Sequence, residues 1–400
     1  MKPQRDISQA DWNNCLRVLR SLARGQAPIP DEQVLKGLVT RLYKQGRKRS
    51  RQRIFGALQR PPAAPPAGPG RDSPPACYQC GRQSAERHPD YAACCFLCGE
   101  DNLMWRERTA DLRGRVALVT GGRVKSGFAV ARRLLACGAE VHVTTRFPAD
   151  AWRRFGAEAG FETWRDRLFV HGLDFRDVPA LEAFAGQCLS VLPHLDLLVN
   201  NAARTNPMPD GEMRALLAAE RPAGFLPGGL EVEAARETGL QDSSANATLA
   251  WNSKIGDVRI REMVAVQLIN VTAPFVLCRA LRPLLARAPL AGRTIVYVTS
   301  QEGRFARRDA CGHHPHTNMA KASLNILTRT CAADYAADGI AMVSIDPGWF
   351  SGMNEGQAGD FQPPLTPEDA AARILQPFWE ALDGESRAGE LLKNFRSAEW

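Results

Sequence analysis

No stretch of the 400-residue sequence stays apolar for the roughly 18 residues that a membrane-spanning helix needs. The N-terminus also lacks the apolar core of a secretory signal, because Lys2, Arg5 and Asp6 interrupt it. We therefore expect a cytoplasmic protein. The hydrophobic share of 44% and the charged share of 24% are ordinary for a folded chain, and the length favours two or more folding units.

Acidic residues are scarce in the first 60 residues, which hold 14 Lys or Arg and 4 Asp or Glu, a net charge of +10. Since the whole chain carries +8, the remainder carries about −2. Apolar residues at helical spacing over 8–24 and after Pro30 predict a basic helical segment at 1–60. Its run KQGRKRSRQR (44–53) has enough positive charge to bind nucleic acid or an acidic protein surface. The run lacks interleaved aromatic residues, so a solvated arm is the simpler interpretation.

The stretch 61–76, PPAAPPAGPGRDSPPA, is too poor in large apolar residues to form a core, and it predicts an extended linker. It separates the basic segment from all that follows.

Of the 11 cysteines, five lie between Cys77 and Cys98. They include two Cys-x-x-Cys-Gly turns, at 77–81 and 95–99. Two such turns bring four thiolates to one ion, which predicts a small zinc-ribbon-like module over residues 77–112. Such a closed four-sulfur site is structural, and the module is a possible partner-binding surface. Its predicted Zn²⁺ ligands are Cys77, Cys80, Cys95 and Cys98, with Cys94 as a spare neighbour and His88 as a surface residue, although either is a possible substitute.

From residue 113 to residue 400 the pattern alternates between strands and helices, which predicts an α/β fold, a Rossmann-like doubly wound parallel sheet. The expected strands lie at 115–120, 140–145, 168–172, 195–200, 294–300, 339–345 and 389–395.

A glycine-rich turn, TGGRVKSG (120–127), follows the first of these strands, and such turns bring backbone amides to a pyrophosphate. It is accompanied, in order, by Asp174, NNAA (200–203), Asn270, Ser300, Lys321 and Pro347-Gly348. This ordered set resembles the short-chain dehydrogenase/reductase superfamily. The resemblance covers residues 113–400 and implies an oxidoreductase that uses NAD(P).

The resemblance implies a cofactor site in which Thr120, Gly121 and Gly127 match the family turn, while Lys125 replaces its middle glycine. Arg146 ends the second strand, where NAD-preferring members usually carry an acid. With Arg123 and Lys125 nearby, it favours a 2′-phosphate and therefore NADP(H) over NAD(H). Further contacts are implied for Gly122, Asp174 against the adenine, Asn200 beside the ribose, Ala202, Lys321, Pro347 and Gly348.

The same resemblance implies a catalytic set in which Asn270, Ser300 and Lys321 match, but Thr317 stands where the family has its proton-transferring tyrosine. A second alignment puts His313 at that position, although the helical register anchored on Lys321 favours Thr317. Because threonine ionises too weakly for this work, His313, His314 and His316 become candidate proton donors.

The resemblance and the missing tyrosine leave two alternative functions. One is an NADP(H)-dependent oxidoreductase with an atypical proton donor, acting on an unidentified carbonyl or alcohol. The alternative is a catalytically inactive NADP(H)-binding sensor or scaffold.

The chain also carries an insertion at about 207–254, which we expect to act as a lid or a partner surface. By resemblance, a homodimer or homotetramer is expected.

Overall fold

The computed structural model describes residues 74–204, 210–220, 253–306, 312–351 and 363–400. The chain divides into two compact units, 1–72 and 73–400, and the first lies outside the described residues. The predicted basic segment therefore falls outside the description, as do nearly all of the linker and most of the insertion.

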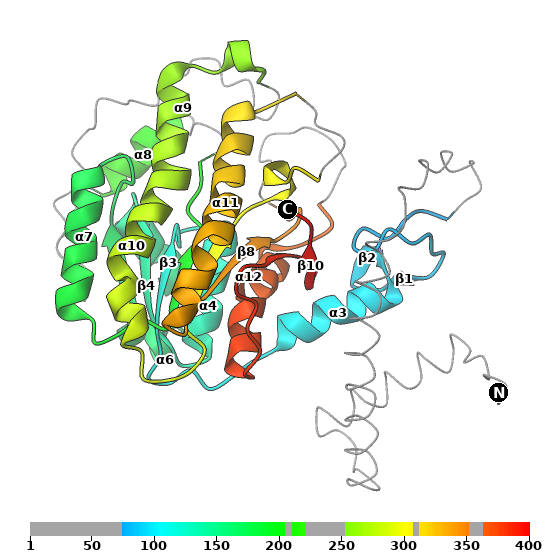
Figure 1. The fold of residues 1–400 in the computed structure, drawn as a ribbon, viewed down its shortest axis with the longest axis horizontal. Coiled ribbons are helices and arrows are strands. Elements are labelled where there is room, and N and C mark those ends of the chain that lie inside the picture. The colour runs from blue at the N-terminus through cyan, green and yellow to red at the C-terminus, as the bar shows by residue number, and fades with distance from the viewer. Residues whose placement is uncertain (1–73, 205–209, 221–252, 307–311, 352–362) are drawn as a thin grey trace, which may run out of the picture. The chain divides into compact units, whose positions relative to one another are not determined.

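An eight-stranded sheet forms the centre of the second unit, in the order β10-β9-β8-β7-β6-β3-β4-β5 (Figure 1). All neighbouring pairs from β5 to β9 run parallel, and β10 pairs antiparallel with β9. This order reverses direction at β3, where doubly wound sheets place their ligand crevice. The strands are β3 (Val116–Thr120), β4 (Glu140–Thr145), β5 (Leu168–Gly172), β6 (Leu197–Asn200), β7 (Thr294–Val298), β8 (Ala341–Asp346), β9 (Leu391–Lys393) and β10 (Arg396–Ala398).

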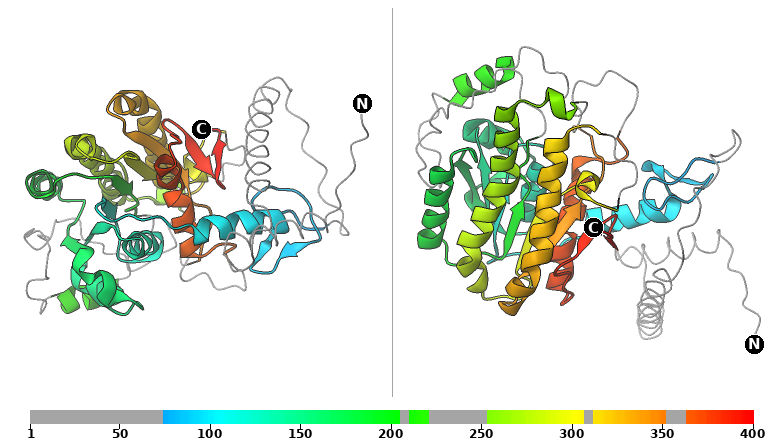
Figure 2. Two further views of the ribbon diagram at one scale, coloured as in Figure 1. Left: turned by 90° about the horizontal axis from the view of Figure 1, so that it is seen from below. Right: turned by 45° about the horizontal axis from the view of Figure 1, so that its top comes forward.

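Helices cover both faces of the sheet, as the views in Figure 2 show. Alternation along β3 explains the two layers, since Ala117 and Val119 join one apolar core while Val116 and Leu118 join the other. The first core packs under α4 (Lys125–Ala136), α5 (Pro148–Gly156), α6 (Phe161–Trp164) and α12 (Pro367–Leu382). The second packs under α7 (Val178–Val191), α10 (Ala273–Ala286) and α11 (Pro315–Ala337).

A π-helical turn, Leu268–Thr272, joins α9 (Ile260–Gln267) to α10. The combined helix is long and apolar enough to cross a membrane by length and composition. Half of its most apolar window is nevertheless buried in the fold, as in the core helices of folded proteins, so this is weak evidence for a membrane span.

The α/β prediction is confirmed, and each of the seven predicted strands is present with ends that differ by a few residues. Strand β10 was not predicted, because three residues give no clear alternation.

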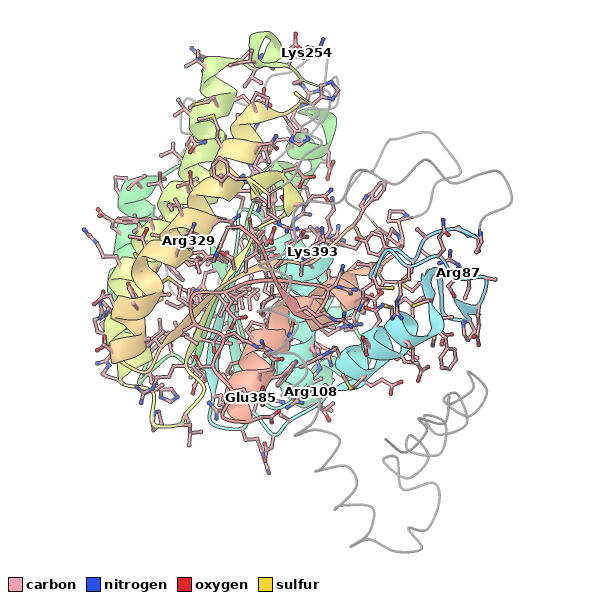
Figure 3. The ribbon with its side chains drawn as sticks, turned by 45° about the vertical axis from the view of Figure 1, so that its right-hand side comes forward. Arg87, Arg108, Lys254, Arg329, Glu385 and Lys393 are labelled. Carbon is pink, nitrogen blue, oxygen red and sulfur yellow. The ribbon has the colours of Figure 1, made fainter. Side chains whose placement is uncertain are left out.

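The cysteine-bearing segment forms a compact module of β1 (Arg87–His88), β2 (Tyr91–Cys95) and α3 (Phe96–Glu107). It belongs to the same compact unit as the sheet. Arg108, the residue after α3, forms an ion pair with Asp383, the residue after α12, at 2.6 Å. Figure 3 marks the outer part of the module at Arg87 and the end of α3 at Arg108.

Candidate functional site

The glycine-rich turn runs from the end of β3 into the start of α4, and its backbone is packed too tightly for side chains. A Cβ on Gly127 would lie 2.3 Å from the carbonyl oxygen of Gly121, and one on Gly122 would lie 2.6 Å from the Val143 side chain. Gly121 itself has a positive φ of 68°. The turn therefore requires glycine at these places, as a cradle for a pyrophosphate does.

Polar side chains fix this turn to the end of β6. The Thr120 hydroxyl accepts hydrogen bonds from the backbone amides of Asn201 and Ala202, each at 3.0 Å. The side-chain Nδ2 of Asn201 donates to the Thr120 carbonyl at 3.0 Å, and its Oδ1 accepts from the Ser126 hydroxyl at 2.8 Å. The carboxyl ends of β3 and β6 are thus joined in one rigid edge.

Lys125, at the position of the family's middle glycine, has a backbone conformation that glycine adopts readily. Its φ is +57°, in the left-handed region that glycine adopts readily and other residues adopt at a cost. A glycine at this position would therefore adopt the same backbone conformation at lower cost.

The predicted 2′-phosphate contacts lie near one another, but they are already engaged. Arg123 and Arg146 both place their guanidinium groups over Phe147, each 5.3 Å from the ring centre. Arg123 also forms an ion pair with Asp150 at 2.7 Å. Asp174 is buried and paired with Arg176, and these bonds with Arg146 nearby hold the pKa of its carboxyl below the usual range despite the opposing effect of burial.

Asn200 ends β6 with its amide buried, and neither its oxygen nor its nitrogen has a hydrogen-bond partner among the described residues. Buried polar atoms are normally paired. This edge of the sheet therefore combines the unpaired Asn200 amide with a turn whose backbone leaves no room for a Cβ at Gly121, Gly122 or Gly127. Both features fit the binding of a dinucleotide.

The predicted catalytic residues lie on three elements beside this edge. Lys321, on α11, is buried and donates from Nζ to the Val298 carbonyl at the end of β7, at 2.7 Å. Burial lowers the pKa of Lys321 to about 8, although the negative charges of Glu302 and Asp346 oppose this shift. Ser300 lies two residues after the end of β7, at the start of the short 3-10 turn Gln301–Gly303.

Close packing fixes α11 against the turn that follows Ser300. A Cβ on Gly303 would lie 2.6 Å from the backbone carbonyl carbon of Lys321. The Asn325 side chain donates to the Gly303 carbonyl at 2.9 Å. Lys321 and Ser300 are therefore held in a fixed relation through the backbone.

Thr317 lies one helical turn before Lys321, in the first turns of α11 and buried. Its hydroxyl has no hydrogen-bond partner in the described part of the chain. His313 is half-buried and precedes the helix, while His314 begins it with a left-handed φ of 37°.

His314 and His316 are both buried, and His316 faces α9. Its Nε2 lies 3.5 Å from a carboxylate oxygen of Glu262, too long for a strong hydrogen bond. Burial lowers the pKa of His316, and the Glu262 carboxylate only partly opposes this shift. Burial therefore favours the neutral form of His316.

Asn270 sits in the π-helical turn with its side chain clamped on the segment after β6. Its oxygen accepts from the Arg204 amide at 2.8 Å, and its nitrogen donates to the Arg204 carbonyl at 3.0 Å. Asn270 therefore links the long helix to the same edge of the sheet that carries Asn200 and the glycine turn.

Family comparisons agree with this arrangement. The model described as "short chain dehydrogenase" matches residues 115–218, and the one described as "Enoyl-(Acyl carrier protein) reductase" matches residues 236–376. Together they span more than half of the chain. The chain belongs to the short-chain dehydrogenase/reductase superfamily.

Individual relatives of this short-chain dehydrogenase/reductase chain are distant. It is 28% identical to protein R665 of Acanthamoeba polyphaga mimivirus over 339 residues, covering 76% of this chain and 71% of that protein. It is 36% identical to retinol dehydrogenase 11 of Mus musculus, but over 92 residues that make up 23% of this chain and 29% of that enzyme. An NADPH-bound carbonyl reductase from chicken superposes with a TM-score of 0.51 at 21% identity, covering 72% of this chain and all of that one.

Cys77, Cys80, Cys95 and Cys98 come together as predicted, with all four sulfur atoms within 4.8 Å of one another. The Cys80 and Cys95 sulfurs lie 3.9 Å apart. Sulfurs around a tetrahedral Zn²⁺ with bonds of about 2.3 Å are separated by nearly this distance. The four thiols therefore fit a metal ion.

The structure separates these four cysteines from the two substitutes. Cys94 is fully buried outside the group of four, and its sulfur accepts from Asn102 at 3.8 Å. The prediction that His88 lies on the surface was wrong. It is buried against Gly99, where a Cβ would lie 2.1 Å from the imidazole, and both ring nitrogens are engaged by Glu100 and the Asp90 amide.

Several residues of the site were missed by the sequence analysis. Asn201 was passed over, although it lies in the NNAA motif that pointed to the site. Glu262 and Arg204 carried no local signal, because they meet His316 and Asn270 only through the fold. Asp346 was signalled by its position before Pro347-Gly348, and it accepts from the Gly348 amide at 2.9 Å.

Proposed function

We propose that the protein is an NADP(H)-dependent oxidoreductase that interconverts a carbonyl and an alcohol, with its proton supplied through Lys321 instead of a tyrosine. The proposal rests on Lys321, whose ammonium is buried and whose pKa is lowered to about 8. Lys321 lies on the same face of α11 as Thr317, one helical turn further along. A group with such a pKa exchanges protons readily near neutral pH, which a threonine hydroxyl does not.

NADP(H) would supply or accept the hydride. On this chain the turn amides at Gly121 and Gly122, with the start of α4, would hold its phosphates. Arg146, at the end of β4, supports a preference for a 2′-phosphate. The chicken carbonyl reductase that shares this fold binds NADPH.

The chain's own residues then divide the remaining work. Lys321 holds a proton at Nζ, and its bond to Val298 fixes that nitrogen. Ser300 lies just after β7, and its hydroxyl would polarise the carbonyl of the substrate. Asn270 fixes the backbone at Arg204 and so the shape of the crevice.

His316 is the second candidate donor. Its burial beside Thr317 supports a role near the reacting atoms, and Glu262 would stabilise its protonated form. Burial nevertheless lowers its pKa and so disfavours that form. His313 is half-exposed, and it offers less shielding from water.

Binding without turnover is the second candidate function. The unpaired Thr317 hydroxyl favours it, because the family's proton-transferring group is missing at that place. In that case the protein would sense or store NADP(H), or act as a scaffold.

The test is NADPH oxidation by purified protein with a broad panel of aldehydes and ketones, comparing the wild type with Lys321→Ala. The exposed lysine variant Lys254→Ala serves as the control. Oxidation that is lost in Lys321→Ala and kept in Lys254→Ala supports the proposal. NADPH binding without oxidation across the panel would favour the sensor.

The cysteine cluster is proposed to hold one structural Zn²⁺, since four sulfurs leave no open position for catalysis. Elemental analysis of fresh protein should find one zinc per chain, and Cys98→Ser should lose it. Metal-free wild-type protein would contradict the assignment.

Cytoplasmic location, a homo-oligomer and a contact of the basic segment with nucleic acid or protein remain predictions. Deletion of residues 1–60 should abolish any binding of DNA or RNA that weakens steeply with salt.

A further inference from the structure

The first cysteine turn of the module reaches the segment that follows β8. Tyr78, between Cys77 and Cys80, accepts a hydrogen bond at its phenolic oxygen from the backbone amide of Trp349, at 2.7 Å. Its ring packs in a small apolar cluster with Phe350, Leu365 and Ala370. A tyrosine that sequence analysis gave no role is therefore in direct contact with the end of the sheet.

Gly348 is shaped to receive this side chain. Its φ is +83°, and a Cβ there would lie 2.8 Å from the Tyr78 oxygen and 2.8 Å from Leu365. The Gly348 amide is held from the other side by Asp346, at 2.9 Å. The backbone from Asp346 to Trp349 is thus fixed by one carboxylate and one phenol.

The module holds Tyr78 firmly in this position. The Tyr78 amide donates to the Ala93 carbonyl at 2.8 Å, and Cys77 donates to the Arg82 carbonyl at 2.8 Å. The next residue, Gln79, accepts from the Asn394 side chain at 3.1 Å. The phenol is therefore supported by the cysteine turn on one side and by the β9–β10 hairpin on the other.

The topology indicates which half of the cofactor site this contact reaches. Arg146 and Asp174 lie beyond β4 and β5, on one side of the reversal at β3, and there they would meet the adenosine half. Strand β8 lies on the other side, next to β7, whose end carries Ser300 and accepts the Lys321 hydrogen bond. Gly348 and Trp349 therefore border the reacting half.

We infer that Tyr78 is a positioning residue, which holds the Gly348–Phe350 backbone at the reacting half of the cofactor site. The expected effect of Tyr78 on NADPH binding rests on the proposed NADP(H) function. Its effect on the Gly348–Phe350 backbone rests on the geometry alone. The cysteine module is then part of the wall of the site.

The experiment compares wild type, Tyr78→Phe and Tyr91→Phe. Tyr78→Phe keeps the ring but removes the acceptor for the Trp349 amide. Tyr91→Phe is the matched control, because it removes another phenol of the same module, one that donates to Asp369 at 2.6 Å on α12. Hydrogen exchange at the Trp349 amide and the affinities for NADPH and for 2′-phospho-AMP, the adenosine half of NADP, are measured on each protein.

In Tyr78→Phe the Trp349 amide should exchange about two- to tenfold faster, the range expected for one lost hydrogen bond. NADPH should bind more weakly by a similar factor, while 2′-phospho-AMP should bind as in the wild type. Tyr91→Phe should leave all three quantities unchanged.

An unchanged Trp349 amide in Tyr78→Phe would overturn the inference. So would an equal loss of affinity for NADPH and 2′-phospho-AMP, or the same effects in Tyr91→Phe, since these would show a general effect on stability. If the wild type binds neither ligand, the proposed function fails, and the exchange of the Trp349 amide still decides the role of Tyr78.

Discussion

The glycine-rich turn and the start of α11 are two places where this chain departs from its family pattern, and the consequences differ. At the turn, Lys125 stands in place of a glycine, and its φ of +57° lies in the left-handed region that a glycine adopts readily. On α11, Thr317 stands in place of a tyrosine, and its buried hydroxyl has no partner among the described residues.

The difference lies in which atoms do the work. The turn binds through backbone amides, so a new side chain is tolerated where the backbone keeps its shape. Proton transfer needs a side-chain group of suitable pKa, and no backbone geometry replaces it. The turn can therefore keep its binding amides with a new side chain, whereas proton transfer on α11 needs another ionisable group, which we propose is Lys321.

The largest effect is expected from restoring the family's tyrosine. Thr317→Tyr should raise the rate of NADPH oxidation with carbonyl substrates by about 100-fold or more, because positioned acid catalysis contributes about 10²- to 10⁴-fold. Rates are measured from the absorbance of NADPH.

Thr317→Phe is the control, since it adds the same ring without a hydroxyl. A rate of NADPH oxidation that rises equally in both variants, or in neither, would show that the missing phenol does not limit proton transfer at this position.

A large effect is also expected at the turn, where the backbone does the work. Gly127→Ala places a Cβ 2.3 Å from the Gly121 oxygen, so the turn must open. Overpacking of about 1–3 kcal/mol corresponds to a loss of NADPH affinity of up to about 100-fold. Titration of NADPH fluorescence measures it.

Gly186→Ala, on α7, is the matched change, because its Cβ meets nothing within 4 Å. It should leave the affinity unchanged. Equal losses of NADPH affinity in Gly127→Ala and Gly186→Ala would contradict the claim that NADPH binding depends on the close backbone approach in the turn.

The buried ammonium of Lys321 should make stability depend on pH. Its pKa is about 8 in the folded state and 10.5 when exposed. Below pH 8 both states hold the proton, and the native state bears the full cost of burial, about 3 kcal/mol at 1.4 kcal/mol per unit of pKa. Between these two pKa values the unfolded state binds more protons, so stability rises with pH.

Lys321→Met should therefore stabilise the protein most at pH 7, with a gain that shrinks as the pH approaches 10. Urea unfolding at several pH values measures this gain. A gain that is constant with pH would show that Lys321 titrates normally.

The smallest effect is expected at Lys125. Lys125→Gly should raise the free energy of unfolding by about 1 kcal/mol, by relieving the left-handed backbone. If the ammonium meets a phosphate, NADPH affinity should fall by no more than about fivefold, as for an exposed ion pair.

Lys125→Ala separates the two contributions, since it removes the charge and keeps the strain. Thermal unfolding and NADPH titration of both variants measure them. A gain in stability with alanine equal to that with glycine would exclude backbone strain as the cause.

The sequence was a good guide where function resides in local patterns. The strands, the glycine turn, the NNAA motif and the four cysteines are each short segments whose spacing reflects one local structure, and the fold places them as predicted. It was a poor guide where meaning arises from residues far apart. The burial of His88 depends on the missing side chain at Gly99, and the contact of Tyr78 with Trp349 joins segments 271 residues apart.

The pairing of Arg123 with Asp150 belongs to the same class, since nothing in either local sequence announces it. Such contacts decide whether a charged residue near a site is available to a ligand.

The role of Lys321 as proton donor is tested by the pH dependence of NADPH oxidation by the wild type, with the best substrate of the carbonyl panel. The rate should be constant at lower pH and fall about tenfold per pH unit above pH 8, as the Lys321 ammonium loses its proton, and Lys321→Met should have no such activity. A profile that is flat through pH 8, or oxidation that persists in Lys321→Met, would contradict it.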